Sequence, residues 1–156
     1  MAYLHLMRAA AVNVDAEVFA FATTLTRLTT ILKLQSLDLA IDQATSTVVD
    51  RYGGTRIAFN IRALLRSRYG GCLRGAIVLI ASDGWDSEPP EDMTEAMARL
   101  RRRAHRVLWL NPRAAAPGFQ PLVGSMAAAL PFCDEFLPAD TIRELADVVK
   151  AIRALS

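Results

Sequence analysis

Two short polar loops carry side chains that can bind a cation or polarise a substrate. The first, YGGTRI at residues 52–57, places Thr55 after a glycine pair and directly before a helical pattern. The second, ASDGWD at 81–86, places Asp83 and Asp86 after an apolar run. Hydroxyl and carboxylate oxygens are ligands that Mg²⁺ accepts, and glycines let the backbone approach closely. The residue types therefore indicate a metal site built from both loops.

Turn chemistry offers a structural alternative for the same residues. Gly53 and Gly54 can form a turn, Thr55 can cap the following helix, and Asp83 can cap the next turn. Spacing alone favours this interpretation. Trp85 has two interpretations that stay open, an exposed anchor for a partner or a cover over the end of a sheet.

Composition narrows the class of protein. The chain is 53% hydrophobic and 22% charged, which predicts one α/β domain over residues 1–156 and excludes a disordered tail. A net charge of +2 does not predict nucleic-acid binding, and the arginines of RLRRRAHR at 99–106 are interpreted as the solvated end of a helix. Cys72 and Cys133 form no CxxC motif, so we expect a reducing cytoplasm. Neither a membrane span nor a signal peptide is indicated.

Hydrophobic spacing predicts how the first half of the chain supports these loops. Apolar residues at helical spacing predict a helix at the N-terminus, and β-formers predict a hairpin from 16–23 and 25–32. Threonine and arginine in the second strand favour a sheet edge. Helices are expected after Ser36 and again from Ile57.

The second half predicts strands alternating with helices. Residues 76–81 are apolar at every position, so we expect an interior strand near the centre of a parallel sheet. A helix from Pro90, a strand at 106–112, a helix at 119–129 and a strand at 132–137 follow. The last helix is expected to be capped by Asp140. Its inward residues are predicted to be Ile142, Leu145, Val149 and Ile152. This alternation predicts a doubly wound sheet with functional loops at the carboxyl ends of its strands.

The order of several segments resembles one protein family. The segments are FAFATTLTRLT, GGTRI, VLIASDGWD, MARLRRRAHRVLWLNP, PGFQPLVGSMAAALP and DEFLP. Together they resemble the CoxE-like branch of von Willebrand factor A (VWA) domain proteins over nearly the whole chain. The resemblance implies a Rossmann-like fold with a metal-ion-dependent adhesion site (MIDAS), in which Thr55 and Asp83 match the second-loop threonine and third-loop aspartate.

The same resemblance implies that the domain is partial. The family's first metal loop, Asp-x-Ser-x-Ser, and the strand before it have no counterpart near the N-terminus of this sequence. Mg²⁺ is therefore an expected but weakened cofactor held by Thr55 and Asp83, and Gly54, Trp85 and Asp86 are expected to bind a partner. Strand edges left unpaired would favour a homodimer.

The resemblance also implies a function. It predicts a non-enzymatic adaptor that works with a MoxR-type AAA+ ATPase, in the maturation of a client metalloenzyme related to molybdenum carbon monoxide dehydrogenase. No residue is assigned catalysis. Two alternatives remain: a metal-dependent phosphohydrolase using Asp83, and a domain fragment without activity of its own.

Overall fold

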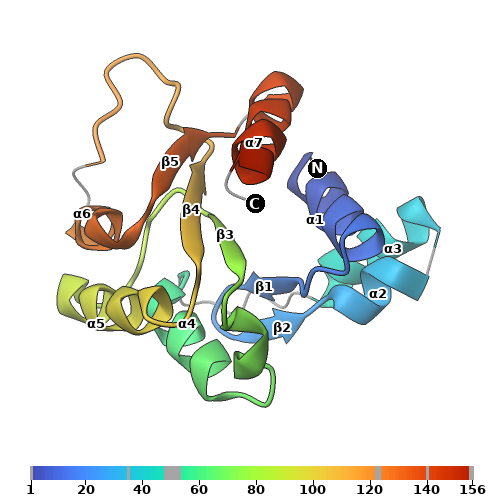
Figure 1. The fold of residues 1–156 in the computed structure, drawn as a ribbon, viewed down its shortest axis with the longest axis horizontal. Coiled ribbons are helices and arrows are strands. Elements are labelled where there is room, and N and C mark those ends of the chain that lie inside the picture. Colours follow the sequence, from blue (N-terminus) through green and yellow to red (C-terminus); the bar gives the residue numbers. More distant parts are fainter. Residues whose placement is uncertain (1, 35, 48–53, 122–123, 140, 155–156) are drawn as a thin grey trace. The chain divides into compact units, whose positions relative to one another are not determined.

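The computed structural model describes residues 2–34, 36–47, 54–121, 124–139 and 141–154. Contacts between Cα atoms divide the chain into two compact units, Met1–Arg56 and Ile57–Ser156. Helices α1 to α3 and a hairpin belong to the first unit, and the parallel sheet belongs to the second (Figure 1). The expectation of a single, partial domain over 1–156 stays a prediction.

The first unit is a group of helices joined to a short hairpin. Its elements are α1 (Ala2–Asn13), β1 (Phe19–Phe21), β2 (Leu25–Arg27), α2 (Thr29–Leu34) and α3 (Leu37–Thr47). Its core consists of small and branched apolar side chains that are at most 6% exposed: Ala11, Val18, Leu28, Leu32, Ala40 and Ala44. Helical spacing predicted α1 and α3 because this periodicity brings apolar residues to one face.

The hairpin is antiparallel, as predicted, and a charged cluster holds its base. Glu17 accepts hydrogen bonds from Arg27 Nε at 2.7 Å and Nη2 at 2.8 Å, and from the Thr29 hydroxyl at 2.8 Å. The hydrogen bond from Arg27 is the largest of the effects that lower the pKa of the Glu17 carboxyl. Thr29 Oγ1 also accepts the Val18 N–H at 2.8 Å. These contacts join β1 and β2 where the next helix begins.

The second predicted strand is shorter than the sequence indicated. Residues 25–32 were expected to be extended, but β2 ends at Arg27 and α2 starts at Thr29. The Leu32 N–H donates to the Leu28 carbonyl, so both leucines face the core from one helical turn, 1% and 0% exposed. Burial of this pair overrides the strand preference of the threonines between them.

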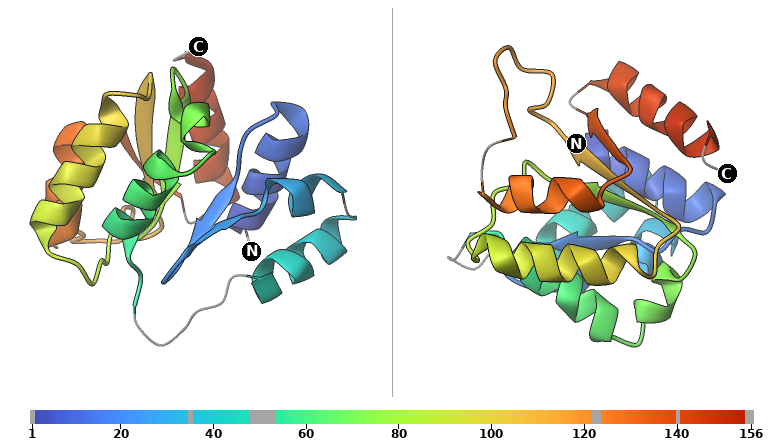
Figure 2. Two further views of the ribbon diagram at one scale, coloured as in Figure 1. Left: turned by 90° about the horizontal axis from the view of Figure 1, so that it is seen from below. Right: turned by 60° about the vertical axis from the view of Figure 1, so that its left-hand side comes forward.

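The second unit is a three-stranded parallel sheet covered by helices. Its elements are α4 (Ile57–Arg66), β3 (Ile77–Ala81), α5 (Pro90–Arg101), β4 (Arg106–Asn111), α6 (Gly124–Ala129), β5 (Glu135–Pro138) and α7 (Ile142–Ala154), with 3₁₀ turns at Gly70–Leu73 and Leu130–Phe132. Helices α4, α5 and α6 lie on one face of the sheet and α7 on the other (Figure 2). The α/β class with a parallel sheet and an antiparallel hairpin is therefore confirmed.

The centre of the sheet is β4, not the strand at 76–81. The strand order is β3-β4-β5, and residues 107–111 of β4 are at most 1% exposed. In the described sheet β3 pairs only with β4, and Leu79 is 37% exposed. The prediction of a central position for 76–81 is wrong. Both strands contain a continuous apolar run, at 77–81 and 107–110, and such a run indicates burial without specifying which strands are neighbours.

The helices confirm some predicted faces and correct others. Met93, Ala96, Met97 and Leu100 of α5 are buried as predicted. Helix α6 begins at Gly124 instead of residue 119, after a segment containing Pro117, Gly118 and Pro121. None of the helices in the described ranges has the length and hydrophobicity needed to cross a bilayer.

The start of α7 also differs from the prediction. Thr141 Oγ1 accepts the Glu144 N–H at 3.2 Å, and Glu144 Oε2 accepts the Thr141 N–H at 2.9 Å. This reciprocal pair is a capping box on Thr141. The predicted cap, Asp140, lies outside the described residues. Of the predicted inward residues, Val149 is 37% exposed and Ile152 is partly buried, and the fully buried residue beside them is Val148. The side chains of Ile142 and Leu145 lie outside the described residues, so their inward position stays a prediction.

Candidate functional site

The loop after β3 is held by side chains from two neighbouring elements, β4 and α6. The carbonyls of Ser82, Asp83 and Gly84 accept hydrogen bonds from Trp109 Nε1 at 2.9 Å, Asn111 Nδ2 at 3.2 Å and Ser125 Oγ at 2.7 Å, respectively. The three donor residues are at most 4% exposed. Buried donors that each meet a successive carbonyl fix the backbone of this loop.

Gly84 is required by the shape of the loop. Its φ is +86°, in the left-handed region that side chains disfavour. A Cβ at this position would lie 2.7 Å from Met126 Sδ and 3.0 Å from Met126 Cβ. The loop is therefore packed directly against α6.

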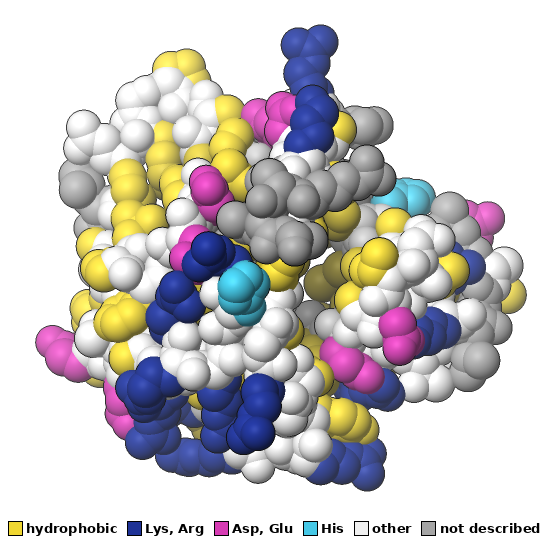
Figure 3. All heavy atoms as spheres, in the orientation of Figure 1, with side chains coloured by type: hydrophobic (Ala, Val, Ile, Leu, Met, Phe, Trp, Pro, Cys, Tyr) yellow, Lys and Arg dark blue, Asp and Glu magenta, His cyan; other side chains and the backbone are white. Residues whose placement is uncertain are grey.

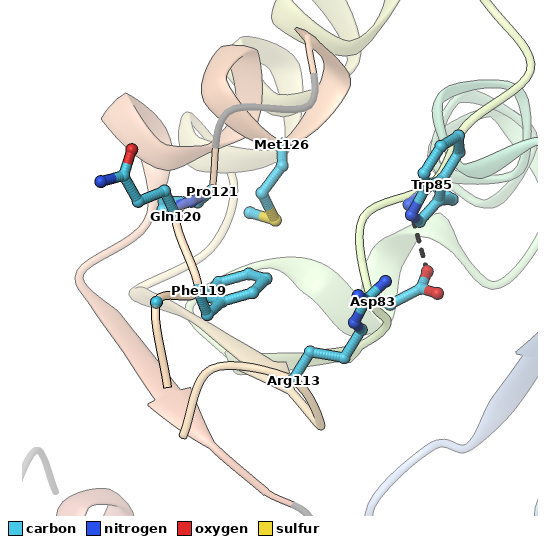
Figure 4. A pocket seen from close by; sticks show the side chains of 8 residues that line it. Asp83, Trp85, Arg113, Phe119, Gln120, Pro121 and Met126 are labelled. Atoms are coloured by element: carbon cyan, nitrogen blue, oxygen red, sulfur yellow. Dashed lines mark hydrogen bonds between the residues drawn. The ribbon is translucent and has the colours of Figure 1, made fainter. Parts of the chain in front are cut away.

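Asp83 serves both as a turn cap and as an exposed carboxylate. Oδ1 accepts the Trp85 N–H at 3.1 Å (Figure 4), as the structural interpretation of this residue predicted. Oδ2 accepts no hydrogen bond from the described residues, and the side chain is exposed. One carboxylate oxygen is thus left for an external ligand.

A pocket of about 270 Å³ lies between this loop and the segment before α6. Its lining residues are Asp83, Trp85, Arg113, Gly118, Phe119, Gln120, Pro121 and Met126. The Phe119 ring is stacked with Phe136 of β5, at a centroid distance of 6.4 Å and an angle of 9°. Figure 4 shows Arg113 extending toward the Asp83 loop. The pocket combines apolar walls with one carboxylate and one guanidinium.

Asp86 faces the start of α4. Its Oδ2 accepts the Ala58 N–H at 2.9 Å, and its Oδ1 accepts the Glu88 N–H at 3.0 Å. Glu88 Oε2 accepts the next helical N–H, that of Phe59, at 2.7 Å. Carboxylates at a helix N-terminus satisfy open donors and oppose the helix dipole. Asp86 thus has a structural role, and partner binding by Asp86 stays a prediction.

Gly54 and Thr55 belong to the first unit, whereas Asp83 belongs to the second. Gly54 has a φ of +71°, and Thr55 is half-buried. The expected convergence of Thr55 and Asp83 on one ion stays a prediction. No cluster of three or more histidine, cysteine or acidic residues is present in the described ranges. Mg²⁺ needs near-octahedral oxygen ligands and Asp83 is the one acidic residue among those lining the pocket, so most ligands of a bound Mg²⁺ would come from water or a partner.

Comparison with known proteins decides the family. The family model for VWA domain containing CoxE-like protein matches residues 1–145. The chain belongs to this CoxE-like VWA family. No curated protein matches the sequence.

One solved structure is similar to this CoxE-like chain. It is an uncharacterized membrane spanning protein from Vibrio fischeri, with 12% identity over 99% of this chain and 84% of that one. The TM-score is 0.34, so the likeness carries no argument about fold or function.

The Asp83 loop of this CoxE-like chain depends on two residues, Asn111 and Ser125, that the sequence analysis did not single out. Asn111 Oδ1 accepts a hydrogen bond from the Arg113 N–H at 2.8 Å, and Asn111 Nδ2 donates one to the Asp83 carbonyl. An asparagine closing an apolar strand was a signal available in the sequence. Ser125, between a glycine and a methionine in a run of small residues, offered no comparable signal.

The cysteines add no nucleophile to this pocket. Burial raises the pKa of the Cys133 thiol to about 12, with a further contribution from the Asp134 charge. Cys133 Sγ contacts the Ala129 carbonyl at 3.5 Å. Cys72 is exposed and lies in the 3₁₀ turn before β3. Neither residue lines the pocket.

Proposed function

We propose that this CoxE-like VWA chain is a non-enzymatic adaptor that binds a partner protein at the pocket beside Asp83. The proposed partner is a MoxR-type AAA+ ATPase, and the proposed setting is cytoplasmic maturation of a molybdenum carbon monoxide dehydrogenase-like client. The observation that carries the proposal is a fixed loop whose residues Asp83 and Trp85 line a pocket that has both apolar and charged walls.

The exposed groups of the pocket suit protein recognition. Trp85 is 58% exposed, and Phe119 and Met126 supply apolar walls. Tryptophan is enriched among residues that dominate interface energetics, because its large ring buries much surface with little loss of conformational freedom. Arg113 supplies a positive charge to pair with a carboxylate of the partner. A loop already held by buried donors loses little further freedom on binding.

The phosphohydrolase alternative has less support. Phosphoryl transfer through an aspartate would use a second carboxylate, a metal or a lysine to neutralise charge in the transition state. Among the described residues lining the pocket there is one carboxylate and no lysine. Both Asp86 oxygens already accept backbone hydrogen bonds. These features favour binding over catalysis.

Metal binding is a separate part of the proposal. Thr55 and Asp83 are proposed to contact Mg²⁺ weakly, because two protein groups leave most of its coordination to water or a partner. Calorimetric titration of the chain with Mg²⁺ tests this. Tight binding, with a dissociation constant below about 1 μM, would show that other ligands complete the site.

Self-association is also proposed, through the outer edge of β3. In the described sheet this edge has no neighbouring strand, and unpaired edges can accept a strand from a second copy. Light scattering at several protein concentrations measures the effect. A monomer at all concentrations would exclude the homodimer.

Partner binding is tested with the MoxR-type ATPase and two single variants. Trp85→Ala is expected to weaken binding about tenfold or more, and Asp83→Asn to weaken it less, with unchanged circular dichroism. Asp147→Asn is the control, since Asp147 lies on α7 and pairs with Lys150 at 2.7 Å. Wild-type affinity in both variants would contradict the pocket as the binding site.

The same variants separate the two classes of function. Hydrolysis of p-nitrophenyl phosphate with added Mg²⁺ should be absent in the wild-type chain. Activity that disappears in Asp83→Asn would instead establish the phosphohydrolase alternative. Absence of both binding and hydrolysis would support the inactive-fragment alternative.

A further inference from the structure

Two arginine-rich segments meet at the amino-terminal end of the sheet in the second unit. Residues 64–76 include the last turn of α4 and the chain after it, and residues 99–106 include the last turn of α5 and the chain up to the first residue of β4. Neither segment contains aspartate or glutamate. Both lead directly into strands, β3 and β4, so their side chains lie at the end of the sheet opposite Asp83.

Backbone and side-chain hydrogen bonds join the two segments into one surface. Arg103 Nη1 donates to the Leu65 carbonyl at 3.0 Å, and the Arg103 carbonyl accepts the Gly75 N–H at 2.9 Å. The His105 N–H donates to the Ala76 carbonyl at 2.8 Å. In Figure 3, dark blue side chains gather in the lower part of the view, where Figure 1 places α4 and α5.

The available carboxylates neutralise only part of this surface. Glu95 pairs with Arg99 at 2.8 Å, and Asp134 pairs with Arg101 at 3.2 Å and Arg106 at 3.5 Å. The remaining arginines are all exposed and have no carboxylate within 4 Å among the described residues. They are Arg66, Arg68, Arg74, Arg102 and Arg103, and together they are called the arginine face.

Helix capping explains why some of the arginines of the arginine face occur at these positions. Cations near the ends of α4 and α5 oppose the helix dipoles, and Arg103 binds a terminal carbonyl of α4. Arg68 and Arg74 lie beyond the last turn of α4, where this effect has decayed. Exposed like charges repel one another, so their concentration here does not favour folding. An anionic partner would remove that repulsion.

We propose that the arginine face is a docking surface for an acidic protein segment, a run of aspartate and glutamate residues on a partner. The guanidinium group presents a planar set of donors that matches carboxylate geometry, and five such groups on one face can engage several carboxylates together. This proposal goes beyond the adaptor function assigned to the Asp83 pocket and does not depend on it.

The chemistry of the face favours a protein over nucleic acid or a membrane. The two segments contain two rings that could stack on a base, those of Tyr69 and His105, and the Arg68 guanidinium lies over the Tyr69 ring at 4.8 Å from the centroid. Exposed His105 is therefore the one open ring in the two segments, whereas single-stranded nucleic acid sites stack successive bases on several rings. The exposed large apolar residues of the second unit, Phe59, Leu79, Trp85 and Val149, lie outside both segments, so the face has no described apolar anchor for a bilayer.

The test is fluorescence anisotropy with labelled octaglutamate as the probe. Wild-type protein is compared with the double variant Arg66→Ala/Arg102→Ala and with a control, Arg143→Ala/Lys150→Ala, which removes the same charge from exposed positions of α7. Binding is measured at about 0.05 M salt and again at about 0.3 M salt. Circular dichroism verifies that each variant is folded.

The arginine-face variant is expected to bind octaglutamate about tenfold more weakly than wild type, and the control within about twofold. Higher salt should weaken wild-type binding. Equal weakening in both double variants would overturn the proposal, because it would indicate binding to overall charge alone. Failure of the wild-type chain to bind octaglutamate would overturn it as well.

Competing partners are tested with the same proteins. Octathymidylate and vesicles containing phosphatidylserine replace the peptide at equal salt. Tighter binding of either one than of octaglutamate, with loss in the Arg66→Ala/Arg102→Ala variant, would assign the face to nucleic acid or to a membrane and overturn an acidic protein partner. Trp85→Ala should leave octaglutamate binding unchanged, so failure of this proposal is distinguishable from failure of the adaptor function.

Discussion

The Asp83 loop and the arginine face place polar groups at opposite ends of the same sheet in different ways. In the loop, Asn111 and Ser125 are 0% and 4% exposed and bind backbone carbonyls directly. On the arginine face, the arginine side chains are exposed, and Arg103 alone among them donates to a main-chain carbonyl in the described residues. Buried hydrogen bonds fix a position, whereas exposed charges attract a partner over a distance. Substitutions at the two ends should therefore change different quantities.

The largest expected difference between exposed and buried groups concerns the two thiols. The Cys133 pKa of about 12 leaves its thiolate roughly a thousandfold scarcer near pH 8 than that of an ordinary thiol, whereas Cys72 is exposed. Labelling with a disulfide reagent should modify Cys72 rapidly and Cys133 only after unfolding. Folding raises the pKa of the Cys133 thiol. The contribution of this thiol to the free energy of unfolding is therefore fully present at pH values below the ordinary thiol pKa and is lost as the pH rises toward 12. Equal rates for both thiols would show that Cys133 is accessible.

Gly84→Ala should cost about 3 kcal/mol in the free energy of unfolding. Its φ of +86° accounts for about 1–2 kcal/mol, and contact with Met126 adds the rest. Gly118→Ala is a matched control, because its φ is +74° but no atom lies within 4 Å of the added Cβ. Urea unfolding measures both. Equal losses would mean that Met126 moves aside and that the loop is packed less tightly than its contacts indicate.

Asn111→Ala should destabilise the second unit by about 2 kcal/mol. The change removes a donor to the Asp83 carbonyl and an acceptor for the Arg113 N–H, and it leaves partly buried backbone groups without those partners. It should also weaken ATPase binding, since Asp83 and Arg113 lose their common support. The exposed residue Asn13 gives the control Asn13→Ala, expected to change stability by less than about 0.5 kcal/mol. If Asn111→Ala unfolds at the same denaturant concentration as the wild type, the loop keeps its conformation without this side chain.

The smallest expected change in stability is that of Arg66→Ala/Arg102→Ala. Both side chains are exposed and have no described carboxylate partner, so the free energy of unfolding should change by less than about 0.5 kcal/mol. Thermal unfolding monitored by circular dichroism measures this. A loss above about 2 kcal/mol would give the arginine face a structural role and remove its contrast with the Asp83 loop.

Much of the local structure follows from patterns in the sequence. The spacing of Met93, Ala96, Met97 and Leu100 predicted the buried face of α5, because helical periodicity is a property of neighbouring residues. Asp83 was expected at the end of a strand, and the structure places it there. The order of motifs also indicated the CoxE-like family that the family model confirms over residues 1–145.

The sequence by itself thus determined the α/β class, most helix faces and the family, all of which depend on local periodicity or on the order of motifs. Only the tertiary structure decided that β4, not β3, lies at the centre of the sheet, because pairing joins residues far apart in the chain. It also decided that Asp86 caps α4 and that Asn111 and Ser125 hold the Asp83 loop. These hydrogen bonds span 28 to 41 positions, a separation over which composition and spacing carry no information about contact.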